Sequence, residues 1–298
     1  MLQTANKSIR YSKESAASLR LCALAGDFTR ALLAVLICLP LLSSVVRAHE
    51  GLHEQIVAIT GKIRLDPKNA SLYLKRGELH RLHRDWSRAA ADYNRAARLE
   101  PALHVVELAR GKMLFESGRP RQAKFVLDRF LIQQPNHVEG LLTRARVLTR
   151  LAARLEAAEG FTQALSLAPT PEPELYLERA QVLAGDKRHV EEALRGLDEG
   201  IKRLGPLVTL ELAAIDLELQ RKNYEAALTR LDLIAAQSAR KETWLVRRGE
   251  ILRDAGRIEE ARAAFDAALV AIDSLPPERR QNRAVTALEL RARSGLKF

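Results

Sequence analysis

The sequence predicts an all-α protein built from stacked two-helix units, and two observations carry this prediction. Pro67, Pro101, Pro135 and Pro169 stand 34 residues apart without a slip. A fixed period of this length marks an array of supersecondary units. Aromatic residues make up only 5% of the chain and the helix formers Ala and Leu dominate, which favours helices over strands.

Other positions recur in phase with the prolines, among them Gly77 and Gly111. The spacing resembles the tetratricopeptide repeat family, and in the first unit the match runs through Tyr73, Gly77, Ala89, Tyr93, Ala96 and Pro101. The resemblance implies a right-handed superhelical solenoid of about six helix-turn-helix repeats. His80 stands where the family usually has an aromatic residue, and Arg76 where it usually has leucine. The arginine itself recurs, at Arg76, Arg110, Arg144, Arg179 and Arg248.

The amino-terminal 48 residues have the pattern of a secretory signal peptide. Residues 31–46 are apolar and uncharged, follow Arg30, and precede a small residue, Ala48, at the expected cleavage site. The run is short for a membrane span of about 20 residues, and Pro40 interrupts it. We therefore predict an exported bacterial protein located in the periplasm or cell envelope. The alternative is an uncleaved segment that anchors the chain in the inner membrane.

Both cysteines, Cys22 and Cys38, lie in this segment. The predicted mature protein therefore has no thiol, which excludes a disulfide framework, a Cys-ligated zinc site and a thiol nucleophile.

After the signal, the chain divides into helical segments without a linker that would separate domains. Residues 49–69 are expected to form an amino-terminal capping helix. Repeat four is expected to be looser, with one extra residue at residues 170–173 and another at 185–187. The carboxyl-terminal segment 277–298 is expected to hold a second capping helix, from Glu278 to Arg293, with a polar outer face. The solenoid spans 70–276, with repeats near 70–101, 104–135, 138–169, 173–206, 207–240 and 242–276.

No pattern typical of an enzyme appears in the sequence. It lacks G-x-S-x-G, a Gly-rich phosphate loop and H-E-x-x-H, so we predict a non-enzymatic protein without a cofactor. The formal net charge is +11; residues 1–48 hold six Lys/Arg and two Asp/Glu, which leaves 42 minus 35, or +7, for the rest. Acidic and basic residues alternate at helical spacing, which is typical of a salt-bridged surface and not of nucleic-acid binding.

Two groups of histidines are weak metal candidates. Cleavage after Ala48 would make His49 the first residue, whose amine and imidazole, with His53, suit Cu(II). A site also needs fixed ligands and a second shell, so a frayed polar end is the preferred interpretation. His80 and His83 lie on one helix near Glu78, but without a third ligand we expect His80 to fill a core position and His83 to face solvent. No metal site is therefore predicted.

By resemblance to the family, the first helices of the repeats line a concave groove. The predicted groove residues are Leu74, Glu78, Arg81, Leu108, Lys112, Phe115, Leu142, Arg146, Leu177, Gln181, Leu212 and Asp216, continued less surely by Val246 and Glu250. An apolar stripe flanked by mixed charge suits an extended or helical peptide. The alternative is that these leucines pack between neighbouring first helices. Leu74 and Leu108 stand where the family's clamp for acidic chaperone tails has Lys and Asn, so that function is not implied.

The sequence thus predicts a scaffold or adaptor that binds a protein or peptide partner in its groove and does not bind nucleic acid. Contact with a membrane is expected only if residues 31–46 remain uncleaved. The competing interpretations are an exported copper-handling protein that uses His49 and His53, and a membrane-anchored assembly subunit. Neither the identity of the partner nor the oligomeric state follows from the sequence.

Overall fold

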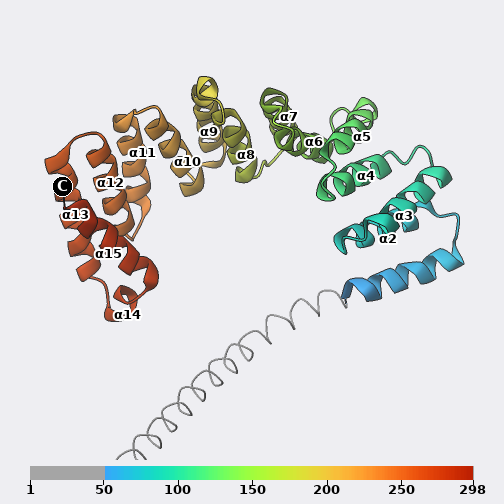
Figure 1. Cartoon of the computed structure of the whole chain (residues 1–298), viewed down its shortest axis with the longest axis horizontal. Coiled ribbons are helices and arrows are strands. Elements are labelled where there is room, and N and C mark those ends of the chain that lie inside the picture. The colour runs from blue at the N-terminus through green and yellow to red at the C-terminus, as the bar shows by residue number, and fades with distance from the viewer. Residues whose placement is uncertain (1–50, 298) are drawn as a thin grey trace, which may run out of the picture. The chain divides into compact units, whose positions relative to one another are not determined.

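The structure, a computed structural model, describes residues 51–297 (Figure 1). The predicted signal segment and His49 lie outside the described residues. Over the described range the regular structure is helical and contains no strand, as the sequence predicts. The described residues divide into two compact units, with the boundary between Val106 and Glu107, and each unit is described by itself.

The first unit contains a helix over residues 51–65, followed by α2 (Ala70–Leu82) and α3 (Trp86–Leu99). The expected capping segment 49–69 is therefore helical from residue 51 to residue 65. The side chain of Asp85 accepts a hydrogen bond from the backbone N–H of Arg88 and so caps the start of α3. The recurring positions Ala89, Tyr93 and Ala96 form the fully buried face of α3.

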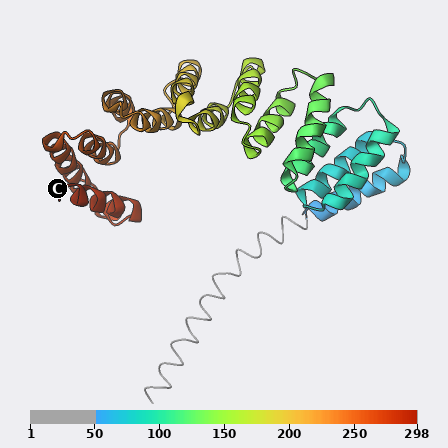
Figure 2. The ribbon, with the colours of Figure 1, turned by 45° about the horizontal axis from the view of Figure 1, so that its top comes forward.

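The second unit continues the alternation of short turns and helices. Its helices pack in consecutive pairs, which Figures 1 and 2 show following one another in chain order. Helix α4 begins just before the boundary between the units. The elements are α4 (Val105–Glu116), α5 (Pro120–Gln133), α6 (Val138–Arg150), α7 (Arg154–Leu167), α8 (Pro173–Ala184), the 3-10 helix η1 (Lys187–His189), α9 (Val190–Leu204), α10 (Val208–Gln220), α11 (Tyr224–Gln237), α12 (Glu242–Asp254), α13 (Ile258–Asp273), α14 (Pro277–Arg280) and α15 (Arg283–Gly295).

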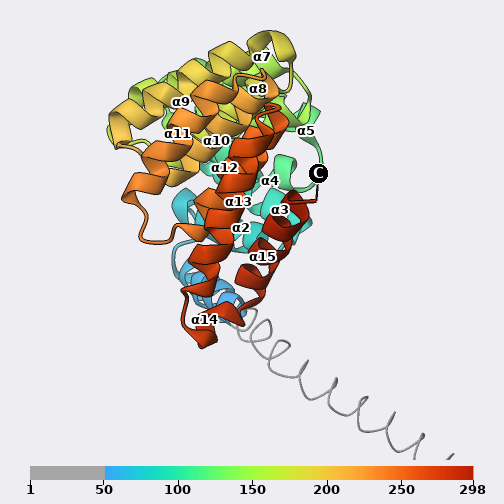
Figure 3. The same cartoon turned by 90° about the vertical axis from the view of Figure 1, so that its left-hand side faces the viewer.

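The carboxyl-terminal segment differs from the single helix expected over Glu278–Arg293. It forms the short α14 and then α15, because Asn282 adopts an extended backbone and its side chain accepts a hydrogen bond from the N–H of Ala284. An asparagine in this role starts a new helix. Figure 3 shows α15 lying alongside α13, where Val285, Leu288 and Ala292 are buried.

The 34-residue period is also present in the backbone of the turns inside the repeats. Residues with positive φ occur at Arg84, Gly118, Ala152, Lys222 and Gly256, each between the first and second helix of a repeat. Repeat four is the exception: its turn is longer and contains η1, where the sequence predicts an extra residue. The left-handed residue lets the backbone reverse in a short turn, although only two of these five positions are glycine.

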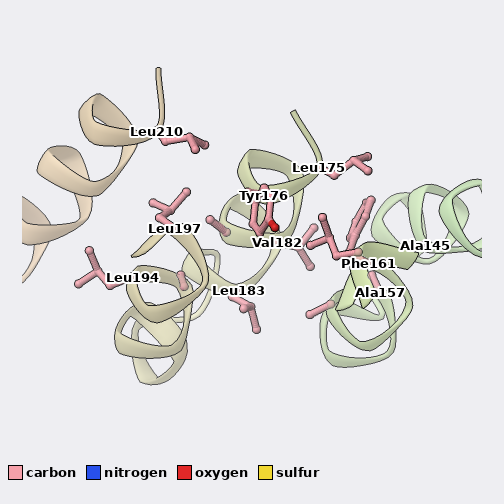
Figure 4. Packing of buried hydrophobic residues seen from close by; sticks show 14 of the residues in the cluster. Ala145, Ala157, Phe161, Leu175, Tyr176, Val182, Leu183, Leu194, Leu197 and Leu210 are labelled. Atoms are coloured by element: carbon pink, nitrogen blue, oxygen red, sulfur yellow. The ribbon is translucent and has the colours of Figure 1, made fainter. Parts of the chain in front are cut away.

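Close packing inside each repeat depends on a small residue facing a large one. A methyl group added to Gly77 would lie 2.5 Å from the Tyr93 ring, and one added to Gly111 would lie 2.6 Å from Leu127. Repeat three has Ala145 at this place, and here the second helix provides the room: a Cβ on Gly160 would lie 3.2 Å from the Ala145 methyl. The buried contacts continue between repeats, and Figure 4 shows Phe161 of α7 beside Val182 of α8.

Four of the five recurring arginines of the first helices pair with carboxylates on second helices. Arg76 donates two hydrogen bonds, of 2.8 and 2.7 Å, to the buried Asp92 of α3. Repeat five lacks the arginine, and there the polarity is reversed, since Arg230 of α11 bonds Glu211 of α10 at 3.2 Å. The departure from the family pattern is thus a packing feature. Arg179 pairs in the same way with Glu199 of its own repeat at 2.7 Å. Arg144 and Arg248 pair instead with the second helix of the preceding repeat, through Asp128 at 2.5 Å and through Asp232. Arg110 pairs with Glu107 of its own helix at 2.6 Å.

Candidate first-helix face

In the second unit, the charged residues predicted for the groove form ion pairs between successive first helices. Lys112 of α4 pairs with Glu139 of α6. The next pair joins Arg146 of α6 to Glu178 of α8 by two hydrogen bonds of 2.8 Å. Their partners were not predicted from the sequence. The spacing of opposite charges by 27 and 32 residues, close to one repeat, is the signal that could have found them.

The row continues toward the carboxyl terminus with its polarity reversed. Asp216 of α10 pairs with Arg247 of α12 at 2.6 Å, and Glu250 of α12 pairs with Arg291 of α15 at 2.7 Å. Between the two halves, Gln181 of α8 is exposed and uncharged. Each pair is partly open to solvent, so each contributes at most about 1 kcal/mol to stability. The pairs therefore balance the charges on this face. Between α8 and α10 the face carries the uncharged Gln181 in place of an ion pair.

The predicted leucines differ in burial. Leu108 is 4% exposed and Val246 is 0% exposed, so both contribute to packing and present almost no surface. Leu74, Leu142, Leu177 and Leu212 are only partly buried. Leu142 and Leu177 lie against the core formed by α6–α10, and Leu212 lies against the core formed by α10–α15. In the second unit, the predicted stripe therefore consists of buried and half-buried leucines and Val246, and none of these side chains is an exposed anchor.

In the first unit, the predicted groove residues Glu78 and Arg81 contact each other. Arg81 bonds Glu78 at 2.9 Å, and the hydroxyl of Tyr93 donates to the same carboxylate at 2.5 Å. Burial, together with this hydrogen bond, raises the pKa of Tyr93, so the hydroxyl stays protonated and remains a donor. In the second unit, Phe115 is partly exposed on α4.

A cavity of about 390 Å³ opens on this face between α6, the start of α7 and α8. Two predicted groove residues, Arg146 and Gln181, line it. Its apolar wall is formed by Phe161 and Val182, which are buried. The other lining residues are Thr149, Ala152, Arg154, Glu178 and Gly185. The cavity combines an apolar wall with a polar rim, which is the composition of a site that takes one side chain of a ligand.

The described part of the chain contains no cluster of three or more metal-ligating side chains. His80 is buried, as expected, and its Nε2 lies 3.9 Å from the Asp92 carboxylate. His83 is exposed. Between residues 51 and 297, no helix has both the length and the apolar composition that a bilayer span requires.

The burial of His80 predicts a specific pH dependence of stability. Desolvation lowers the pKa of His80 below its usual value, so the folded state binds this proton less readily than the unfolded chain. The stability from neutral His80 is therefore complete above about pH 6.5 and is lost as the pH falls through the folded pKa. We expect the melting temperature of the first unit to fall from pH 7 to pH 5 more in the wild type than in His80→Phe.

Fluorescence of Trp86 in a Trp244→Phe background measures this transition, because the chain has two tryptophans and Trp86 lies in the first unit. The control is His83→Phe, on the exposed side of the same helix, which should keep the wild-type pH dependence. An unchanged pH dependence in His80→Phe would show that this histidine does not contribute.

Comparisons with known proteins relate the chain to helical repeat proteins. A family model described as a tetratricopeptide repeat-like domain matches residues 171–290. The C-terminal part of a tetratricopeptide repeat-containing protein from Cytophaga hutchinsonii has a similar structure, with a TM-score of 0.63 and 15% identity over 83% of this chain and 95% of that chain. This likeness shows the fold. A comparison with curated protein sequences gave no match.

Two other solved structures are similar at lower TM-scores. A tetratricopeptide repeat protein from Parabacteroides merdae has a TM-score of 0.48 and 19% identity over 81% of this chain and 92% of that chain. PilF from Pseudomonas aeruginosa has a TM-score of 0.48 and 14% identity over 74% of this chain and 96% of that chain.

Proposed function

Because the chain belongs to the tetratricopeptide repeat family, we propose that it is a non-enzymatic scaffold whose first helices bind a peptide segment of a protein partner. The observation that carries this proposal is the cavity between α6 and α8. It is bordered by Arg146 and Gln181, two residues that the repeat register assigns to the groove. Stacked two-helix units use such a face for extended partners.

The ion pairs of the row support a peptide as the ligand. The fixed charges near the cavity are balanced, since Arg146 is held by Glu178. These ion pairs leave little net positive charge on the first-helix face to attract a polyanion. A peptide would gain from the apolar wall of Phe161 and Val182 and from hydrogen bonds to the amide of Gln181. The partner is thus a segment that inserts an apolar side chain between α6 and α8.

Site-specific photo-crosslinking in the native cells tests this proposal. A photoreactive amino acid replaces Gln181 in the cavity or, as the control, Glu159, which is exposed on α7 away from the cavity lining. We expect a discrete crosslinked partner from position 181 and none from position 159. A second variant, Thr149→Trp, fills the cavity and should abolish the crosslink at unchanged helical content. Equal crosslinking from both positions, or a crosslink that survives Thr149→Trp, would overturn the proposal.

We also propose that the scaffold acts in the cell envelope, on the basis of the signal-like segment at residues 31–46. The mass of the native protein tests this. Loss of residues 1–48 would agree with export and cleavage, and a full-length mass in the membrane fraction would indicate the anchored alternative. A full-length mass in the cytosol would contradict both.

A further inference from the structure

Exposed cations gather at one end of the helix pairs of the second unit. From α4 to α9, the turns between first and second helices and the adjoining helix ends carry five exposed basic side chains that have no carboxylate within ion-pair distance among the residues that the structure describes. They are Arg119, Arg121, Arg150, Arg154 and Lys187, and we call them the basic edge. Carboxylates of the same turns already have partners: Glu156 lies 3.8 Å from Arg144, and Asp186 bonds Arg188 at 2.7 Å.

The turns at the opposite end of these pairs are different. The segments 134–137 and 205–207 contain no Lys or Arg. Cations that do occur near this end include Arg240, which pairs with Glu242 at 2.8 Å, Lys241, which donates to the carbonyl of Ala235, and the exposed Lys202 in the last turn of α9. The fold thus distributes exposed basic side chains unevenly between the two ends of the helix pairs. Among the described residues from α4 to α9, exposed cations without a carboxylate partner are concentrated at the basic edge.

Two cavities link three successive turns of the basic edge. One, of about 460 Å³, joins the α4–α5 turn to the α6–α7 turn and is lined by Gly118, Arg119, Pro120, Arg121, Gln122 and Leu151. The other is the 390 Å³ cavity, whose lining includes Ala152 and Arg154 of the α6–α7 turn and Gly185 of the α8–η1 turn. The larger cavity lies outside the predicted groove residues. Near it, Leu155 is 52% exposed at the start of α7.

We propose that the basic edge is a second docking surface, which binds an acidic stretch of a protein partner and receives one of its apolar side chains in the 460 Å³ cavity. Charge complementarity selects an acidic ligand, since five exposed cations are left unneutralised. The cavity selects a protein segment over a lipid surface, because a headgroup layer has no side chain to place beside Leu151 and Pro120. The 460 Å³ cavity shares no lining residue with the 390 Å³ cavity of the first-helix face, so the two docking sites can be tested separately.

The test measures binding of defined probes to the purified full chain by fluorescence polarisation at physiological salt. The main probe is a labelled extended peptide that alternates Glu with Leu. The comparison probes are an all-Glu peptide, single-stranded oligothymidine and vesicles containing phosphatidylglycerol. Arg121→Glu should weaken the Glu/Leu peptide by about tenfold or more, because a lining cation becomes an anion.

Two further variants make the result specific. Lys202→Glu makes the same change of charge on an exposed residue of α9 far from the turn in sequence, and it should alter the affinity less than about twofold. Gln122→Trp fills the cavity without a change of charge; it should weaken the Glu/Leu peptide and leave the all-Glu peptide unaffected. Helical content checks that each variant is folded.

Three outcomes would overturn the proposal. Equal losses in Arg121→Glu and Lys202→Glu would mean nonspecific attraction to a basic protein. An unchanged affinity in Gln122→Trp would mean that the cavity holds no side chain. Tighter binding of vesicles or oligothymidine than of the peptide, lost in Arg121→Glu, would assign the edge to a membrane or to nucleic acid. None of these outcomes bears on crosslinking at Gln181, so this proposal and the first-helix face can fail independently.

Discussion

Replacing Phe265 by alanine is expected to lower the free energy of unfolding of the second unit by about 3–5 kcal/mol, the usual cost of emptying a large buried aromatic site. Phe265 is 0% exposed and lies between α12 and α15. A methyl group added to Gly249 or Gly295 would come within 2.6 or 2.5 Å of its ring. One side chain therefore holds three helices together, and its removal leaves a cavity that rigid glycine backbones cannot fill.

Urea unfolding followed by Trp244 fluorescence in a Trp86→Phe background measures this loss, because Trp244 lies on α12. Val270→Ala, on the same helix but 70% exposed, is the matched control and should change stability by less than about 0.5 kcal/mol. A loss below about 1 kcal/mol in Phe265→Ala would contradict the packing described for this end of the chain.

Replacing Arg76 by methionine should destabilise the first unit by about 3 kcal/mol, because it leaves the buried carboxylate of Asp92 without its cation. The side chain of Asp92 is 7% exposed and accepts two hydrogen bonds from Arg76. Trp86 fluorescence in the Trp244→Phe background follows the transition. In contrast, the double variant Arg76→Met/Asp92→Leu should regain most of the loss, since an apolar pair replaces the ion pair.

The control for Arg76 is the arginine at the same position of another repeat. Arg144 pairs with Asp128, whose side chain is 35% exposed, so water can hydrate the carboxylate after Arg144→Met. We expect a cost of about 1 kcal/mol or less there. Similar losses in the two arginine variants would mean that burial of the carboxylate does not determine the effect.

The sequence predicted the elements that depend on contacts within one repeat. The helical fold, the 34-residue spacing of the repeats and the longer turn of repeat four all follow from local periodicity and turn length. The break at Asn282 was missed, because one capping hydrogen bond decided it against an otherwise helical pattern.

Contacts between repeats were harder to predict. The period assigned Leu108 and Leu142 to the same position, yet Leu108 is buried and Leu142 is only partly covered, because the covering residues belong to other helices. The partners of Lys112 and Arg146 likewise depend on how successive helices are rotated against each other. A register assigns residues to faces of a helix but does not specify the angle between repeats.

In repeat three the glycine at the close helix contact lies on the second helix and not on the first, and this restricts which helices can be combined into a hairpin. In the period of 34 residues, Gly160 of α7 occupies the place of Asp92 in α3 and of Val126 in α5. A hybrid hairpin of α6 with either of those helices would place a side chain at the position where the methyl of Ala145 now faces Gly160. Duplication of a whole hairpin keeps each small residue together with the side chain of the other helix that packs against it. Recombination inside a hairpin separates the two residues. Each helix is thus matched to its own companion, and the hairpin is the smallest piece of the array that can be exchanged without disturbing this packing.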